Sequence, residues 1–433
     1  MQTRVSGLTL ALGALLFVHA VLLTLGLHLL LRVPRADTLA FHVDAFVAGN
    51  QRGDSWRPMD AARRFAAEHP GASIYDTVFF GQGMKFQYPP SALLLTGNLS
   101  RPALNVISRI AVCLTVALSV FLFERTMRAA GWMPLGAIDA WFRIVVCAGL
   151  GLSFYPLLKA YSLGQIQVWI DLLFAVLMAV WMRVPAVGGL CLALICLVKP
   201  HFALVGVWGV LRRQWQFVTA FAVALLIGLA ISVTVYGLRS HVDYLRVITF
   251  ISERGEAFYA NQSFNGLLNR AIFNGENIEW QETTFAPPHR LVKAGTTMAA
   301  VALVAAALWL PRRRGHAGAL DLAVISLTVT MASPVAWEHH YGILLPLFAV
   351  TTAEVLRLRP FGGYTAPALA VAFIVTGQYF QPLQRLAATP FNPLQSYVLF
   401  GSLLLLLLWL RALRLPGVDP GPREQSAPRA AEL

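Results

Sequence analysis

The sequence predicts an all-α, polytopic integral membrane protein, and three observations predict this fold class. Hydrophobic residues make up 57% of the 433 residues, whereas charged residues make up only 13%. The mean hydropathy is +0.63, far above the average of soluble proteins. Apolar stretches of about 18 residues or more recur from one end of the chain to the other, and each is long enough to cross a bilayer as a helix.

About twelve transmembrane or re-entrant helices can be placed on these stretches. The first, residues 6–31, is too long for the apolar region of a signal peptide, so we expect it to be the first membrane helix. The fifth and sixth are short for a bilayer core and predict either two spans or one re-entrant hairpin. The expected helices are residues 6–31, 105–127, 137–158, 164–182, 186–198, 202–211, 217–236, 291–310, 319–332, 340–356, 364–378 and 397–413.

The positions of the basic residues predict the orientation. The formal net charge is +13, and in a membrane protein such an excess marks the cytoplasmic side rather than a nucleic-acid partner. With a cytoplasmic N-terminus, every second junction between helices is basic. These junctions carry Arg125 and Arg128; Arg183; Arg212 and Arg213; Arg312, Arg313 and Arg314; Arg357 and Arg359; and Arg411 and Arg414. The short junctions on the other side are nearly free of charge, except for Lys159 and Lys199.

This orientation predicts a multi-pass protein of the plasma (inner) membrane with both termini in the cytoplasm. Residues 1–414 form a single transmembrane domain, and the Pro- and Gly-rich residues 415–433 form a disordered cytoplasmic tail. Two long polar loops, residues 32–104 and 237–290, both fall outside. The polar and aromatic variety is therefore concentrated on one face, which favours a site at the outer membrane boundary. The four cysteines all lie inside apolar runs, so neither a disulfide framework nor a zinc site is predicted.

The first long loop carries six acidic residues, and two of those that precede an amphipathic helix expected at residues 59–68 are candidates for chemistry. These two are Asp44 and Asp54. For any one loop carboxylate, a solvated or capping role is more common than a catalytic one. The segment "FQYPP", residues 86–90, approaches the membrane in an extended form, and Tyr88 suits the headgroup level.

Three further motifs carry polar residues to the same side. In "VKPHFAL", Lys199 and His201 fit either a snorkelling anchor at the membrane surface or a phosphate-binding site. In "YSLGQIQVWIDLL", Gln165 precedes Gln167 and Asp171, which lie four residues apart on one helix face and predict a lined cavity or a bond between helices. In "NQSFNGLLNR", the amides of Asn261, Gln262 and Asn265 can bind sugar hydroxyls, and Asn265 is also placed to cap the next helix.

The series "GDSWRPMDAARRF", "FQYPPSALLL", "LGQIQVWIDLLF", "KPHF", "NQSFNGLL" and "SPVAWEHHYGILLPL" resembles family 87 of the GT-C glycosyltransferases. The resemblance runs in the same order from the first helix to the tenth. It implies a GT-C-like membrane enzyme that takes a sugar, often mannose, from a polyprenyl-phosphate carrier. It also implies an inverting reaction with one general base and a glycolipid or polysaccharide acceptor, among membrane lipids. The family's acidic residue stands some seven positions before an Ala-Ala pair, which corresponds to Asp54 here, with Asp44 as the second candidate.

The remaining residues follow from that chemistry. Transfer to an alcohol needs a carboxylate base, and a phosphate leaving group needs cations or hydrogen-bond donors. The donor phosphate is therefore assigned to Lys199, His201, His339 and His340. Substrate contacts are assigned to Tyr88, Gln165, Asn261, Gln262, Asn265, Trp337 and Glu338.

The tip "SPVAWEHHYG", residues 333–342, has alternative interpretations. It is either part of this site or only a polar hairpin tip with an interfacial Trp337. Binding of a divalent ion by Glu338, His339 and His340 stays an open alternative, although adjacent histidines rarely reach one metal together. We expect no cofactor and assign no metal ligand.

Two other functions fit the same topology. A transporter or flippase of lipid-linked glycans would line a path with Lys159, Asp171 and Lys199, but the long outer loops and the absence of a visible repeat favour an enzyme. A related glycan ligase with a lipid-diphosphate donor would need more cationic residues in the outer loop.

Overall fold

The structure, a computed structural model, describes residues 5–309 and 318–415. Within these residues the fold is built from helices, and the nearest approach to a strand is a single bridge between Asn261 and Trp337. The prediction of an all-α polytopic membrane protein is confirmed. Among the described residues, six segments are long and apolar enough to cross a membrane: Gly7–Leu29, Arg101–Ala129, Trp215–Arg254, Arg290–Trp309, Glu338–Leu358 and Asn392–Ala412.

Most predicted helices lie within a few residues of the observed ones. The first span consists of α1 (Gly7–Leu16), a π-helical stretch (Phe17–Leu22) and α2 (Leu23–Leu29). The other helices that correspond to predicted ones are α6 (Arg101–Ala129), α7 (Ala137–Leu152), α9 (Gln167–Val180), α10 (Pro185–Cys196), α11 (Ala203–Leu211), α12 (Trp215–Arg254), α14 (Arg290–Trp309), α15 (Ala319–Ala332), α16 (Leu344–Leu358), α17 (Thr365–Gly377) and α18 (Tyr397–Ala412). Residues 312–314 and 416–433, which carry one basic junction and most of the expected tail, lie outside the described residues.

Two departures from the prediction occur at chain breaks. The expected helix 137–158 ends at Leu152, and α8 (Tyr155–Leu163) continues at an angle of 51°. The expected loop at residues 159–163 is therefore the last turn and a half of α8. The second departure is α12, which runs on past the predicted end at residue 236 and changes direction at Gly237, whose φ is +76°.

The first long loop, residues 32–104, is largely helical. It contains α3 (Leu39–Ala48), α4 (Trp56–Glu68), a π-helical turn (Tyr75–Gly81) and α5 (Ala92–Thr96). The helix expected at 59–68 is α4, which buries Trp56, Met59 and Ala62 and leaves its arginines near the surface. Burial of one apolar stripe is what the alternation of apolar and charged residues predicts. The second long loop carries α13 (Phe264–Ala271).

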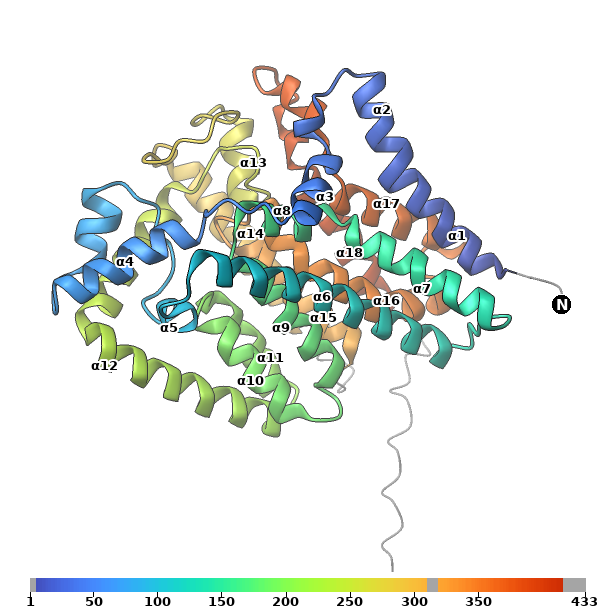
Figure 1. Cartoon of the computed structure of the whole chain (residues 1–433), viewed down its shortest axis with the longest axis horizontal. Coiled ribbons are helices and arrows are strands. Elements are labelled where there is room, and N and C mark those ends of the chain that lie inside the picture. Colours follow the sequence, from blue (N-terminus) through green and yellow to red (C-terminus); the bar gives the residue numbers. More distant parts are fainter. Residues whose placement is uncertain (1–4, 310–317, 416–433) are drawn as a thin grey trace, which may run out of the picture.

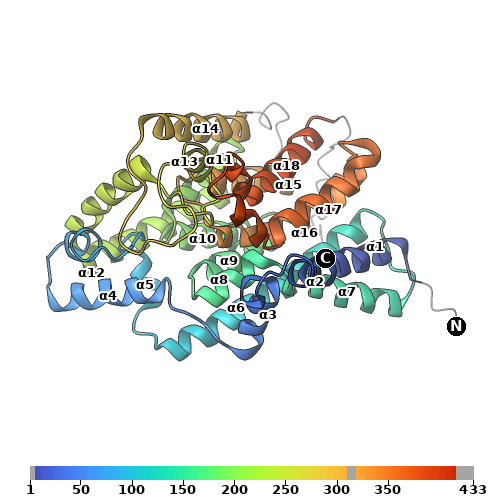
Figure 2. The ribbon, with the colours of Figure 1, turned by 90° about the horizontal axis from the view of Figure 1, so that it is seen from above.

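The two long loops are fastened to each other. Lys85 Nζ lies 2.5 Å from Glu256 Oε1 in a buried ion pair and 4.0 Å from the centre of the Trp280 ring. Nearby, Arg246 pairs with Asp76 at 2.7 Å. Figures 1 and 2 show α4, α5 and the far end of α12 together at the left of the molecule. The loops thus form one cap rather than two independent flaps.

Two other ion pairs are buried between helices. Arg212 on the junction after α11 binds Asp321 at the start of α15 with an N–O distance of 2.6 Å. Arg143 on α7 binds Glu124 on α6 at 2.5 Å. Both arginines are fully enclosed, so each carboxylate offsets a charge that would be costly to bury alone. Arg212 is therefore a helix-packing residue as well as a basic junction residue.

Candidate active site

Asp54 lies in a short segment that docks onto the end of α8. Its backbone N–H donates to the carbonyl of Leu163 at 2.9 Å, and the N–H of Ser55 donates to the carbonyl of Gly164 at 3.1 Å. Gly164 has φ +74°, and a Cβ there would stand 2.6 Å from the carbonyl oxygen of Arg52. The close approach of the two chains therefore depends on glycine. This docking brings Asp54 next to Gln165, which belongs to a separate motif.

A hydrogen-bond network fixes the side chain of Gln165 against the Asp54 carboxylate. Gln165 Nε2 donates to Asp54 Oδ2 at 2.6 Å. Its other amide atom, Oε1, accepts from Ser55 Oγ at 2.6 Å and from the Tyr88 hydroxyl at 3.1 Å. With two donors on Oε1, the amide has one orientation, and its N–H groups face Asp54. The structure thus brings together the predicted residues Asp54, Gln165 and Tyr88.

The protein around Asp54 changes the acidity of its carboxyl. Although the residue is exposed, neighbouring protein removes part of the carboxylate's water, and this desolvation raises the pKa above its ordinary value. The Gln165 hydrogen bond and the charges of Lys159, Arg52 and Arg57 oppose the rise. A carboxylate with a raised pKa is a stronger base, which suits proton abstraction from an alcohol.

Asp44, the second candidate for the base, has a different setting. It lies on α3, where Arg35 Nη2 contacts its Oδ2 at 2.5 Å. Its side chain is 54% exposed, so both the ion pair and water stabilise the charged form. The Gln165 network does not include it.

The segment expected to be an exposed hairpin tip is instead buried in the middle of the molecule. Residues Glu338–Ile343 form a 3₁₀ helix, η6, that packs against α8, and Glu338 has no exposed surface. Tyr155 donates to Glu338 Oε2 at 3.0 Å, and Tyr397 donates to Oε1 at 2.9 Å. This polar cluster takes the place of solvent around the Glu338 carboxylate.

Lys159 lies beside Glu338, and its charge also acts on Asp54, although sequence reasoning did not assign it to the site. Its ammonium donates to the Tyr155 hydroxyl at 2.9 Å and lies 3.6 Å from Glu338 Oε2. The rings of Tyr155 and Tyr379 stack with centres 5.0 Å apart, and Lys159 lies 5.4 Å from each. The charge of Lys159 also acts on Asp54 and on His339. The one signal in the sequence was its place on a junction otherwise free of charge.

Lys199 belongs to a second buried group that includes the predicted histidines. Its ammonium donates to Gln167 Oε1 at 2.6 Å, and Gln167 Nε2 donates to Asp171 Oδ1 at 2.7 Å, as the four-residue spacing predicts. Within the described ranges, no carboxylate lies within 4.0 Å of the Lys199 ammonium.

The histidines around Lys199 are close to its charge. That charge acts on the imidazoles of His201, His339 and His340, and His339 stacks edge-on with His340 at 4.8 Å. His339 Nε2 is buried without a hydrogen-bond partner. A buried ammonium and an unsatisfied ring nitrogen together favour an anionic ligand.

The amides of residues 261–265 bind protein in this structure. Asn261 Nδ2 donates to the carbonyls of Glu256 and Pro334, and its Oδ1 accepts from the N–H of Ala336 at 3.0 Å. Gln262 donates to two carbonyls and accepts from the N–H groups of Val398 and Leu399. These contacts hold η6 in place, and sugar contacts by these amides stay a prediction.

The sequence left open whether Asn265 caps the next helix, and the structure gives this role to Ser263. The cap of α13 is Ser263, which accepts from the N–H of Gly266 at 3.2 Å, so capping by Asn265 is wrong. Asn265 Oδ1 accepts from the N–H of Glu256, and its buried Nδ2 has no partner.

Trp337 packs edge-on against Trp280 with ring centres 5.3 Å apart. Among the described residues, no three His, Cys, Asp or Glu side chains are placed to share a metal ion.

A helical fold whose described residues include six segments long and apolar enough to cross a membrane defines a polytopic membrane protein, and Asp54, Lys159 and Lys199 belong to its candidate site. The sequence model of glycosyltransferase family 87 matches residues 86–334. Because the match covers more than half of the chain, the protein belongs to glycosyltransferase family 87.

Curated relatives are similar over a comparable part of the chain. A polyprenol-phosphate-mannose-dependent alpha-(1-2)-phosphatidylinositol pentamannoside mannosyltransferase of Mycolicibacterium smegmatis is 26% identical over 293 residues, 65% of each protein. A polyprenol-phosphate-mannose-dependent alpha-(1-2)-phosphatidylinositol mannoside mannosyltransferase of Mycobacterium tuberculosis is 25% identical over 288 residues, 62% of each. The chain thus covers a little under two thirds of these relatives' length. No solved structure gives a significant match.

Proposed function

We propose that this protein transfers mannose or a related sugar from a polyprenyl-phosphate carrier to a hydroxyl of a glycolipid or polysaccharide. The observation that carries the proposal is the orientation of Gln165, which points an N–H at Asp54, while the charge of Lys159, which contacts Glu338, also acts on that carboxylate. The names of the relatives, which specify polyprenol-phosphate-mannose and phosphatidylinositol mannosides, support a lipid-linked donor and a glycolipid acceptor.

The proposed reaction is a single displacement with inversion. Asp54 takes the proton of the acceptor hydroxyl, whose oxygen forms a bond to the anomeric carbon of the sugar. The bond from that carbon to the phosphate oxygen breaks, and the electron pair leaves with the phosphate. General-base catalysis by one carboxylate contributes about 10²–10⁴-fold to such a step. We prefer Asp54 to Asp44 because Asp44 is engaged by Arg35 and lies outside the Gln165 network.

The departing phosphate is assigned to Lys199, His201, His339 and His340. Lys199 is buried, and among the described residues its hydrogen-bonded link to a carboxylate, Asp171, runs through Gln167, so a phosphate would supply a counter-charge in direct contact. Donors held in place before the reaction stabilise charge that develops on a leaving group. Glu338 and Trp337 are proposed to contact the sugar or to shape its pocket.

The site is proposed to face outside, in a single transmembrane domain of the plasma (inner) membrane with both termini cytoplasmic. Basic residues recur at alternate junctions between helices, such as Arg125, Arg183 and Arg212, and this alternation favours a cytoplasmic position for those junctions. A lipid-linked donor suits an outer site, because its carrier resides in the bilayer. Soluble nucleotide sugars are made in the cytoplasm and are not available on the outer side.

Purified full-length protein with a radiolabelled polyprenyl-phosphate mannose and glycolipid acceptors tests the proposal. We expect Asp54→Asn to lower kcat by about 10²–10⁴-fold. Glu68→Gln, which changes an exposed carboxylate of the same loop, serves as the matched control and should retain full activity.

Three outcomes would contradict parts of the proposal. Unchanged transfer by Asp54→Asn would refute the base assignment, and selective loss in Asp44→Asn would reassign the base to that residue. Absence of transfer from every lipid-linked donor would favour the transporter or flippase.

A further inference from the structure

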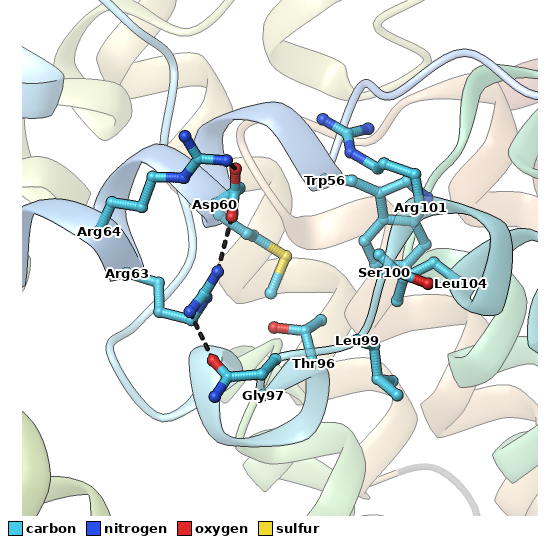
Figure 3. Close-up of a pocket in the computed structure, with 12 residues that line it drawn as sticks. Trp56, Asp60, Arg63, Arg64, Thr96, Gly97, Leu99, Ser100, Arg101 and Leu104 are labelled. Carbon is cyan, nitrogen blue, oxygen red and sulfur yellow. Dashed lines mark hydrogen bonds and ion pairs between the residues drawn. The ribbon is translucent and has the colours of Figure 1, made fainter. Parts of the chain in front are cut away.

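A pocket outside the groups described above lies between α4, α5 and the start of α6. Its volume is about 380 Å³, which is within the range of small-ligand sites. Figure 3 shows Asp60, Arg63 and Arg64 on one side and Trp56, Ser100 and Arg101 on the other. The floor is formed by Thr96 and its neighbours at the end of α5. The pocket is therefore polar on two walls and has an aromatic side chain within reach.

The charges in this pocket are not balanced. Asp60 pairs with both Arg63 and Arg64, each at 2.8 Å, so one carboxylate serves two arginines. In the described part of the chain no carboxylate lies within 4.0 Å of Arg101; Asp60 attracts its charge from farther away, and the charges of Arg57 and Arg64 repel it. Three lining arginines and one lining aspartate give the pocket a net charge of +2 (3 − 1 = 2), and among the described residues Arg101 is the lining arginine without an ion pair. Arginine forks match the oxygens of a phosphate group.

The start of α6 adds to this positive field. Arg101 is the first residue of a helix that runs to Ala129, and Ser100 caps it by accepting from the N–H of Ala103. The N-terminal end of so long a helix carries partial positive charge and favours anions close to it. The helix end and the arginines therefore act in the same direction.

The pocket adjoins the proposed base through Arg101. A Cβ on Gly53 would clash with the Arg101 guanidinium, so that group lies directly over Gly53 and beside Asp54 in the chain. None of the residues that line the pocket belongs to the Lys199 and His339 group assigned to the donor phosphate. The pocket is thus a cationic region distinct from the Lys199 group.

We propose that this pocket binds the phosphodiester of an anionic lipid acceptor and so holds the acceptor hydroxyl near Asp54. The inference rests on the proposed function and adds the substrate class: the acceptor is a phosphate-bearing glycolipid rather than an uncharged one. Arg101 is the principal contact because its charge is unpaired, and Arg63 and Arg64 complete the wall. The sugar portion of the acceptor lies toward Asp54.

The test compares two acceptors with the same glycan and acyl chains, one joined through a phosphodiester and one without phosphate. Full-length protein in phosphatidylcholine nanodiscs receives polyprenyl-phosphate mannose and each acceptor. We expect Arg101→Gln to lower the ratio of kcat/KM for the phosphodiester acceptor over the neutral one by about 10-fold or more, the loss of one charged hydrogen bond. Arg128→Gln, which removes a partly exposed arginine at the other end of α6 from Arg101, should keep the wild-type ratio. An unchanged ratio in Arg101→Gln would overturn the proposal.

A second arm measures binding without catalysis. Equilibrium binding of a fluorescent phosphodiester acceptor should weaken about 10-fold or more in Arg101→Gln, whereas phosphatidylglycerol should compete poorly in the wild type. Equal binding by both proteins, or equal competition by phosphatidylglycerol, would assign these arginines to bulk lipid and refute the acceptor site. Because this arm needs no turnover, a protein that binds the acceptor but transfers no sugar would contradict the proposed function alone.

Discussion

Gln165 shows how one side chain sets the chemistry of another. Its carbonyl oxygen is taken by Ser55 and Tyr88, so its amide N–H groups are turned toward the Asp54 carboxylate. A donated hydrogen bond stabilises the charged form of a carboxylate and lowers its pKa. Desolvation acts in the other direction and raises the pKa of Asp54. The acidity of the proposed base is therefore the result of two opposed contacts.

Loss of the Gln165 donor should move the pH dependence of transfer. A base must be deprotonated, so kcat/KM falls as the pH drops through the pKa of Asp54, which already lies above its ordinary value. In Gln165→Leu the stabilising N–H is gone, the pKa rises further, and the acid limb of the kcat/KM profile should move to higher pH. Gln82→Leu, an exposed glutamine of the same loop, should leave the profile in place. A uniform loss of rate with no shift would indicate a purely structural role.

At the scale of residues, the sequence could supply the participants but not their partners. Asp54, Gln165 and Tyr88 were each singled out from a different motif, and hydrogen bonds now connect them. Ser55 was not singled out, although it links all three motifs, because a serine beside an aspartate carries no distinctive pattern. Lys159 was noted as a charge on the wrong side and as part of an alternative transport path, but not as a site residue, since Glu338 and Tyr379 come from distant segments.

Among the elements, α8 depends on the glycine that ends it. Gly164 and Gly49 both follow a helix in the left-handed conformation, with φ of +74° and +75°. They differ in their surroundings: a Cβ at Gly164 meets the Arg52 carbonyl at 2.6 Å, whereas one at Gly49 meets a flexible Arg109 side chain at 3.1 Å. The pair therefore separates the cost of the backbone conformation from the cost of displacing the Asp54 segment.

Substitution of these two glycines by alanine should give different results. Both variants carry the backbone cost of about 1–2 kcal/mol and should lower the Tm. Only Gly164→Ala pushes the segment that carries Asp54 away from α8, so we expect at least a ~10-fold lower kcat/KM for it alone. Thermal unfolding and transfer assays on the two proteins check this, and equal activity losses would contradict the docking argument.

Element positions were largely predictable where the apolar pattern was long. The limits of α15 match the expected helix 319–332, and α6, α14 and α18 differ from prediction by a few residues. The prediction failed where a tertiary contact overrides the local pattern. The bend between α7 and α8 falls inside an unbroken apolar run, and α3 lies in a loop whose polar residues gave no helical period.

For the whole molecule, the buried pair of Lys85 and Glu256 is the main electrostatic link between the two long loops. Burial raises the pKa of Glu256 to about 7, against the pull of Lys85, and burial lowers the pKa of Lys85. Each charge is therefore tolerated mainly because the other is present. The exposed pair of Lys293 and Glu253, at 3.0 Å, offers a comparison in which water already solvates both groups.

Removing one member of the buried pair should destabilise the protein in a pH-dependent manner. Lys85→Met leaves Glu256 buried alone, and we expect a loss of about 3–5 kcal/mol. The loss should be larger at pH 8 than at pH 6, because Glu256 can take up a proton at the lower pH and become neutral. Lys85→Met with Glu256→Met should regain most of the stability, and Lys293→Met should cost less than about 1 kcal/mol. Thermal unfolding at the two pH values would contradict this if all variants behaved alike.

The class of the whole molecule followed from composition alone, because 57% hydrophobic residues in long runs admit few other folds. The family followed from the order of short motifs, and the match over residues 86–334 confirms it. The ion pair that fastens the two loops to each other could not be predicted, since Lys85 and Glu256 are 171 positions apart and neither stands in a recognisable motif.

The bridge between Asn261 and Trp337 couples two distant motifs, so that their residues move together. Gln262 and Glu338 each donate a backbone N–H across this bridge, to Ala336 and Ala260 respectively. A substitution at Asn261 is therefore transmitted to the carboxylate of Glu338 without any substrate present. An Asn261 variant would then be inactive because Glu338 is displaced. The position of Trp337, rather than the rate of sugar transfer, distinguishes this displacement from the loss of a sugar contact.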